Sequence, residues 1–464
     1  MLLRGIVLNL ILQKISGKEV IPLVDGGKGI SISTGETCGA WAAEGGVGTF
    51  SAVNADSYDE NGNVIPQIYH GKTREERRRE LIEYAVAGGI AQAKIARERS
   101  NGKGRIHMNA LWEMGGSREI IERILEVAKD CVHGVVCGAG MPYELAEIAA
   151  KYRVHYYPIV SSARAFSALF RRSFKKVQEL LGGVVYEDPW LAGGHNGVSN
   201  ADDPLKPQNP YLRLVALRSV MNEFGLHMIP IIIAGGVWWL SEWEDYINNK
   251  ELGLVGFQFG TRTILTKECP VAEHWHDKLM SLKKGDVKLT QLSPTGFYSS
   301  AVNNELVADL LARLERQVKI EEFSSLKAMI GKREIYLDPS RRADIERWAS
   351  EGYSEAMLTP DNTVVFVTPE QSKQILHDQR SCSCCLSACR FSSWCQHNGS
   401  TGKIPDPRTF CIQKNLQNIA HGGDIEKNLM FAGHLAYRFA QDPFYANGFI
   451  PTVHQLFERI LTGC

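Results

Sequence analysis

Apolar residues in the first part of the chain gather in short runs that polar, helix-like stretches separate. Eight such runs lie at residues 20–24, 48–53, 105–112, 134–137, 155–160, 183–186, 229–234 and 254–259. Several are apolar at consecutive positions, which is typical of parallel strands buried on both faces. The intervening stretches carry helical patterns, and residues 117–129, for example, open on a serine cap and a charged first turn. This alternation predicts a (β/α)8 TIM barrel of the α/β class, with a doubly wound open sheet as the alternative.

The alternation stops near residue 310. Residues 306–317 predict a helix, residues 334–368 contain short strand-like pieces, and residues 425–440 and 452–461 predict two further helices. We therefore divide the chain into a barrel at residues 1–310 and a mostly helical, cysteine-rich domain at residues 311–464. The apolar run at the start of the chain is interrupted by Asn9 and lacks a small-residue cleavage site. It predicts a strand or helix packed on the barrel and not a signal peptide.

Charge and hydropathy narrow the class of protein. The 52 Lys and Arg residues balance 52 Asp and Glu residues, so the chain lacks the basic character that favours a nucleic-acid partner. No apolar stretch reaches the roughly 18 residues that a membrane span needs. These features predict a cytoplasmic protein that acts on a small molecule. They are compatible with a homo-oligomer. In that compartment, clustered cysteines hold metal more often than they form disulfides.

Two glycine motifs follow the seventh and eighth predicted strands, where barrels of this kind bind phosphate. Gly235 and Gly236 allow backbone N–H groups to approach a phosphate closely, and Gly260 does the same after the next strand. Gln258 and Thr261 add a side-chain amide and a hydroxyl. Either motif alone is a weak signal, since a glycine after a strand is often only a turn. Together, at the ends of consecutive strands, they predict a phosphate site.

A histidine follows the sixth predicted strand. Gly193 and Gly194 form a tight turn that can direct His195 into the mouth of the barrel. Histidine titrates near neutral pH and suits proton transfer. A hydrogen-bonded loop histidine is the alternative, but the Gly-Gly-His-Asn-Gly sequence at a strand end favours an acid–base role.

With these three motifs in this order, residues 20–270 resemble the nitronate monooxygenase (2-nitropropane dioxygenase) family of FMN-dependent TIM barrels. That group includes the flavin-dependent enoyl-acyl-carrier-protein reductases. The resemblance implies that His195 is the base or acid near flavin N5. It also implies an FMN site made of Asn109, Gly193, Gly194, Gly235, Gly236, Gln258, Gly260 and Thr261. In that site Asn109 contacts the flavin, the first glycine pair lies beside its ring or ribityl chain, and the remaining five residues hold the phosphate.

The chain departs from the family at several points. The sixth strand ends in Glu187-Asp188-Pro189-Trp190, where the family usually has a small, flavin-contacting sequence. The long polar loop at residues 54–71 and the C-terminal third are extra. Because loops of this fold build the substrate pocket, the resemblance implies the fold and the cofactor more firmly than the substrate.

Three functions are open on this basis. The main hypothesis is oxidation of a nitronate-like carbon acid by O2. The second is reduction of an activated double bond by an FMN and iron–sulfur enzyme, with NAD(P)H or a redox protein as electron donor. The third is a non-catalytic nucleotide- or nucleic-acid-binding protein with a structural zinc site.

Six of the 11 cysteines fall within one short window. These are Cys382, Cys384, Cys385, Cys389, Cys395 and Cys411. The Cys-x2-Cys-x3-Cys spacing of Cys382, Cys385 and Cys389, with Cys411 as a distant fourth thiol, predicts a 4Fe–4S cluster. It resembles the iron–sulfur segment that follows the flavin barrel of 2,4-dienoyl-CoA reductases. A zinc site on the same thiolates and no metal are the alternatives, and Cys384 or Cys395 could replace a named ligand.

Overall fold

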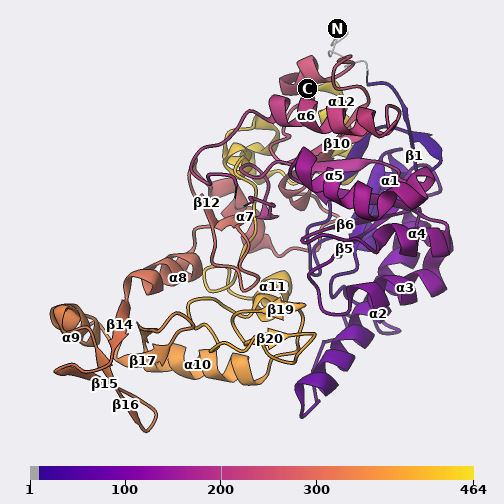
Figure 1. The fold of residues 1–464 in the computed structure, drawn as a ribbon. Helices are drawn as coiled ribbons and strands as arrows, with labels where there is room; N and C mark the ends of the chain where they lie inside the picture. Colours follow the sequence, from indigo (N-terminus) through magenta and orange to yellow (C-terminus); the bar gives the residue numbers. More distant parts are fainter. Residues whose placement is uncertain (1–9, 200, 464) are drawn as a thin grey trace.

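A computed structural model describes residues 10–199 and 201–463 (Figure 1). Eight parallel strands close into a barrel in the order β10-β11-β3-β4-β5-β6-β7-β8. They are β3 (Leu23–Asp25), β4 (Val47–Ser51), β5 (Arg105–Leu111), β6 (Gly134–Gly138), β7 (His155–Val160), β8 (Val184–Glu187), β10 (Ile231–Ala234) and β11 (Val255–Phe259). The structure confirms the TIM barrel, and closure of the sheet excludes the open-sheet alternative. The predicted packing of a strand or helix at residues 1–9 lies outside the described residues.

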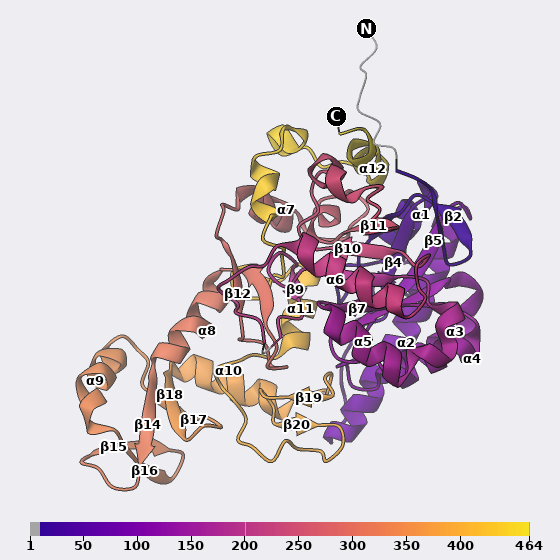
Figure 2. The ribbon, with the colours of Figure 1, turned by 45° about the horizontal axis from the view of Figure 1, so that its top comes forward.

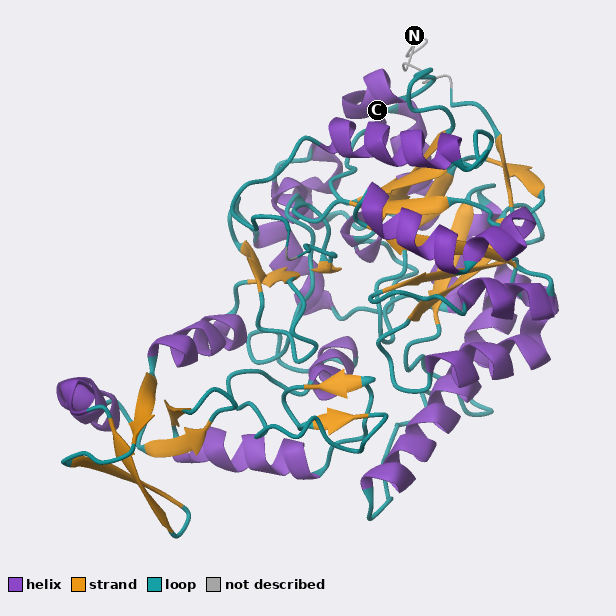
Figure 3. Cartoon of the chain, in the orientation of Figure 1, coloured by secondary structure: helices purple, strands orange, loops and turns teal. Residues whose placement is uncertain are grey.

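Helices enclose the barrel strands (Figure 3). The chain supplies α1 (Gly35–Ala43), α2 (Arg74–Arg99), α3 (Ser117–Ala128), α4 (Leu145–Tyr152), α5 (Ala163–Arg172) and α6 (Pro210–Glu223), with short 3-10 helices η1 (Lys129–Cys131), η2 (Phe174–Leu180), η3 (Leu240–Tyr246) and η4 (Thr261–Ile264). α2 begins with a capping box in which Thr73 and Glu76 satisfy each other's backbone N–H groups. Residues 54–71 form the predicted loop ahead of that helix.

A hairpin closes the end of the barrel at which the strands begin. It pairs β1 (Gln13–Ile15) with β2 (Lys18–Val20). The sequence pattern assigns Val20 to the first barrel strand, and the structure corrects this, because Val20 ends the hairpin and the barrel strand begins at Leu23. Its turn residue Ser16 bonds the Tyr157 hydroxyl at 2.7 Å and His107 Nε2 at 3.0 Å inside the barrel. The barrel floor is therefore filled, and the opposite end is left for a ligand.

The region beyond the barrel is helix-rich and also carries a five-stranded antiparallel sheet. The helices are α7 (Glu273–Ser281), α8 (Glu305–Glu315), η5 (Pro339–Arg341), α9 (Arg342–Ser350), α10 (Pro369–Arg380), α11 (Ile412–Ala420), η6 (Ala436–Ala440), η7 (Pro443–Gly448) and α12 (Val453–Thr462). The sheet has the order β15 (Leu326–Ile330), β16 (Arg333–Leu337), β14 (Gln317–Glu321), β18 (Thr363–Val367), β17 (Glu355–Leu358). In both views this sheet and α9 project away from the barrel (Figures 1 and 2).

The last part of the chain returns to the barrel. α12 packs beside α1, with the Phe457 and Trp41 ring centroids 5.0 Å apart. The predicted helix at residues 425–440 is wrong except for η6. Residues 431–433 are not helical, because Phe431 forms a β-bridge with Ala301 and Gly433 bonds Thr261 at the barrel mouth. The division at residue 310 stays a prediction. Among the described residues, none of the helices combines the length and the apolar character that crossing a membrane requires.

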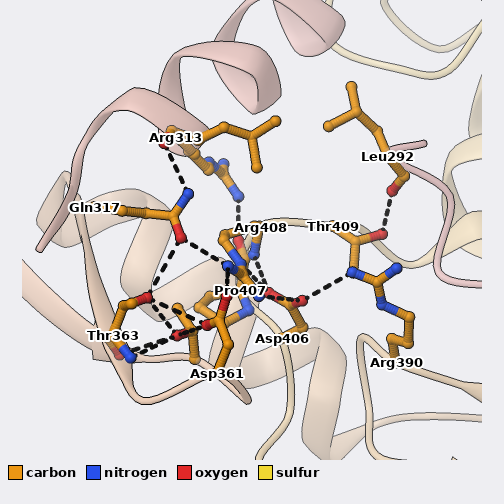
Figure 4. A network of polar contacts seen from close by, with 12 residues as sticks. Leu292, Arg313, Gln317, Asp361, Thr363, Arg390, Asp406, Pro407, Arg408 and Thr409 are labelled. Atoms are coloured by element: carbon orange, nitrogen blue, oxygen red, sulfur yellow. Dashed lines mark hydrogen bonds and ion pairs between the residues drawn. The ribbon is translucent and has the colours of Figure 1, made fainter. Parts of the chain in front are cut away.

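A polar network ties the projecting sheet to the segment that precedes Cys411 (Figure 4). Arg408 is its centre, and it donates to Asp406 Oδ1 and Asp361 Oδ2, both at 2.8 Å. Arg313 donates to the Pro407 carbonyl at 2.9 Å. Because Asp406 is fully buried, its carboxylate depends on these cations, and the network fixes the segment against α8 and the sheet.

Candidate functional site

A cavity of about 240 Å³ opens at the carboxyl ends of the barrel strands. Every residue predicted to bind FMN or to act as acid or base lines it, although they come from four different strand ends. These are Asn109, Gly193, Gly194, His195, Gly235, Gly236, Gln258, Gly260 and Thr261. The structure thus brings the nine residues together, while their roles stay predictions.

The glycines give one wall of the cavity the form of an anion cradle. Gly235 and Gly236 adopt left-handed backbone angles, with φ of +86° and +77°, and this conformation favours glycine. A Cβ added at Gly260 would meet no atom within 4 Å, so the backbone there faces open space. These positions leave backbone N–H groups accessible, as a bound phosphate requires.

Two side-chain amides of the wall have no hydrogen-bond partner within the described part of the chain. Asn109 is buried at the end of β5 and packs against Gly27, where an added Cβ would lie 2.3 Å from the Asn109 side chain. Gln258 packs in the same way against Gly26. Since buried amides normally have partners, the unpaired Asn109 amide fits a polar ligand, and the half-buried Gln258 amide lines the same cavity.

His195 is held by a small sheet that the sequence pattern does not reveal. Strand β9 (Gly194–His195) pairs with β13 (Ser299–Val302), which pairs in turn with β12 (Val287–Thr290). The imidazole Nε2 lies 2.7 Å from Ser293 Oγ and 3.3 Å from Thr295 Oγ1. Burial lowers the pKa of His195 to about 4. The ring is therefore neutral near pH 7 and can accept a proton.

The segment Phe431–Ala436 forms a further wall that sequence reasoning missed. The backbone N–H of Gly433 donates to Thr261 Oγ1 at 2.8 Å, and the Phe431 ring lies 5.6 Å from the His195 ring, edge to face. About 170 residues separate Gly433 from Thr261 in the sequence. The C-terminal region therefore completes the cavity.

Sequence reasoning also missed a buried ion pair in the cavity wall. Lys28 Nζ lies 2.5 Å from Asp25 Oδ1, and Thr263 donates to the same oxygen at 2.6 Å. Lys28 follows β3 and lines the cavity beside the glycines. The Gly-Gly-Lys-Gly sequence at residues 26–29 is the signal that could have indicated it, since it places a cation at a strand end.

The loop that carries the cysteines docks on the end of β5. The Gly115 N–H donates to the Cys385 carbonyl at 2.9 Å, and Ser387 Oγ donates to Glu113 Oε2 at 2.6 Å. Within the loop, the short strands β19 (Ala388–Cys389) and β20 (Trp394–Cys395) pair with each other. Cys385 itself lines the cavity, which places the cysteine loop directly beside the predicted flavin site.

The structure does not support the predicted metal site. Within the described ranges, no three His, Cys, Asp or Glu side chains come together in a way that could hold a metal ion. This finding leaves the alternative of a structural zinc protein without support. Burial, and then the charges of Cys411, Cys389 and Cys382, raise the pKa of the Cys385 thiol.

Comparisons with known proteins agree with this geometry. A family model described as nitronate monooxygenase matches residues 12–334. FabK from Thermotoga maritima has a similar fold, with a TM-score of 0.51 and 14% sequence identity over 99% of this chain and 96% of that chain. The enoyl reductase domain of MlnA from Bacillus amyloliquefaciens gives a TM-score of 0.53 and 11% identity over 95% and 93%. A search of curated protein sequences returned no match. The two structures show the fold alone.

Proposed function

Because the chain belongs to the nitronate monooxygenase family, we propose that it is an FMN-dependent oxidoreductase that oxidises a nitronate-like carbon acid. The observation that carries the proposal is the single cavity on which Asn109, His195 and the two phosphate motifs converge. FMN would supply two-electron redox chemistry there, and the protein would supply position and electrostatics.

The residues of the cavity fit that cofactor. Backbone N–H groups at Gly235, Gly236 and Gly260 would bind the phosphate, since their positions are left-handed or face open space. The unpaired amide of Asn109 would bind a polar atom of the flavin, and that of Gln258 would bind the phosphate. Thr261 already accepts the Gly433 N–H, so its hydroxyl hydrogen is free to face the phosphate.

His195 provides the acid–base chemistry in this proposal. Its neutral imidazole takes the proton from the acidic carbon of the substrate, and Ser293 and Thr295 hold the ring in place through Nε2. Phe431 covers the ring from the side. The lowered pKa keeps the imidazole unprotonated before the substrate binds.

A second candidate function is reduction of an activated double bond with electrons that enter through a 4Fe–4S cluster. The observation that favours it is the place of Cys385 in the cavity wall, together with the Cys-x2-Cys-x3-Cys spacing. Cys382, Cys385, Cys389 and Cys411 would hold the cluster. Because the described thiols are not gathered into a ligand set, the iron and sulfide content decides this candidate.

One set of measurements separates the two candidates. The purified protein is reconstituted anaerobically with FMN and mixed either with a nitroalkane at alkaline pH or with NAD(P)H and a conjugated enone. Consumption of O2 with the nitronate supports the main proposal, and enone reduction supports the second. An iron and sulfide content near four per chain supports the cluster. It should be lost in Cys385→Ser and kept in the control variant Cys131→Ser. Full flavin loading with neither reaction would contradict both functions.

A further inference from the structure

A second titratable group, Glu187, faces the same cavity as His195. Glu187 is the last residue of β8 and lies in register with Ala234 of β10, the residue before the Gly235–Gly236 pair. Its side chain is partly exposed and lines the cavity. Within the residues that the structure describes, its carboxyl group has neither a hydrogen-bond donor nor a cation beside it. The carboxyl group is therefore available to a ligand.

The adjacent carboxylate has a different task. Asp188 Oδ1 accepts the backbone N–H groups of Trp190 and Leu191, each at 2.9 Å. Asp188 does not line the cavity, and these bonds fix the turn that leads to Gly193. The two neighbouring acidic residues thus have different roles. Asp188 shapes the turn, and Glu187 faces the cavity.

The surroundings keep Glu187 in its neutral form. Burial, and then the charge of Asp188, raise the pKa of Glu187 to about 8. His195 is uncharged at neutral pH. The other charged side chains of the wall have partners of their own: Lys28 with Asp25, Arg262 with the Trp238 carbonyl and Asp442, and Glu113 with Ser387. At pH 7, then, the cavity contains a protonated carboxylic acid and a neutral imidazole.

We propose that Glu187 is a second catalytic group, a carboxylic acid that hydrogen-bonds the nitro or carbonyl oxygen of the substrate. The inference rests on the proposed function. When the carbon–hydrogen bond breaks, its proton passes to His195 and its electron pair moves toward that oxygen. Glu187 keeps its proton and donates a hydrogen bond to the growing negative charge. The substrate class is thus a small carbon acid whose acidic C–H adjoins a nitro or carbonyl group.

The place of Glu187 in the fold suits this role, because the strand β8 ends in a carboxylic acid that lines the cavity. A neutral donor suits the site better than a cation, because burial makes the charged form of any group costly. An ionised carboxylate would instead repel a nitronate, so proton loss from Glu187 should lower substrate binding and turnover together.

The first test needs no turnover. Infrared spectra of the FMN-loaded protein are recorded between pH 6 and 10 for the wild type, Glu187→Gln and Glu113→Gln. The inference predicts a carboxylic-acid carbonyl band that disappears with a midpoint near pH 8, is missing in Glu187→Gln and persists in Glu113→Gln. If no such band is present at pH 6, or if it survives in Glu187→Gln, the inference is overturned.

The second test uses kinetics with a nitroalkane substrate. Glu187→Ala should lower kcat/KM by about 100-fold, while FMN affinity stays as in the wild type. Glu187→Gln keeps a hydrogen-bond donor, so it should retain most activity and lose the fall in kcat/KM above pH 8. Wild-type rates in Glu187→Ala, or an unchanged alkaline fall in Glu187→Gln, would refute the role. His195→Ala distinguishes failure of this inference from failure of the proposed function. If His195→Ala loses turnover while the Glu187 variants keep wild-type kinetics, only the role of Glu187 is overturned.

Discussion

The left-handed glycine at the phosphate end of the cavity offers a quantitative test of the site. Gly235→Ala places a side chain at φ +86°, which costs about 1 kcal/mol or more for an L residue. The new Cβ would also lie 3.1 Å from the Ala192 backbone nitrogen and from Asp188 Cβ. Such crowding costs about 1–3 kcal/mol. The two effects together predict a loss of about 2–4 kcal/mol in the free energy of unfolding.

The same substitution should weaken FMN binding, because the backbone must shift where the phosphate would sit. A shift that costs about 1.4 kcal/mol of binding lowers affinity tenfold. Urea unfolding of the apoprotein measures the first effect, and quenching of FMN fluorescence measures the second. Gly225→Ala is the matched control. It has φ +77° but open space around the new Cβ, so it should lose only about 1 kcal/mol and bind FMN normally. Equal stability and equal FMN affinity in Gly235→Ala and the wild type would refute the reasoning.

Two further predictions address proton transfer and stability. His195→Ala should lower turnover by about 100-fold or more at unchanged FMN affinity. In the wild type, kcat/KM should fall as the pH drops through about 4, since protonation of His195 removes the base, and a profile that is flat down to pH 3 would contradict this role. Arg408→Ala should lower the free energy of unfolding by about 3 kcal/mol, because the buried Asp406 carboxylate loses its main partner. Arg390→Ala is the control, because the Arg390 side chain is half exposed and bonds Asp406 at 3.3 Å. Thermal unfolding of the two variants checks the prediction, and equal melting temperatures would count against it.

The barrel and most of the predicted site could be inferred from the sequence. Short apolar runs identify the barrel strands, and several are apolar at consecutive positions, since a strand buried on both faces needs no alternation. Glycines at strand ends identify the cradle because few other residues tolerate its backbone angles. Both signals lie within a few consecutive residues, so they can be recognised in the sequence without knowledge of the fold.

Features that depend on contacts between residues far apart in the sequence could not be predicted in this way. Gly433 meets Thr261 only because the C-terminal region returns to the barrel, and the extended run around Phe431 carries a helix-like pattern in the sequence. Ser293 reaches His195 through pairing of β9 with β13, about 100 residues away. The cysteine spacing predicts a shared site for four thiols, but spacing alone does not give the distances that decide whether metal binds.

The central claim is that the cavity holds FMN beside His195. Its most direct test is an anaerobic absorption spectrum of the protein purified after addition of FMN, followed by addition of a neutral nitroalkane, whose acidic C–H proton is still in place. We expect about one FMN per chain and bleaching of the flavin absorption by the nitroalkane in the wild type. In His195→Ala, which lacks the base that removes this proton, we expect flavin to be bound but little bleaching. A protein that retains no flavin, or a His195→Ala variant whose flavin bleaches at the wild-type rate, would contradict it.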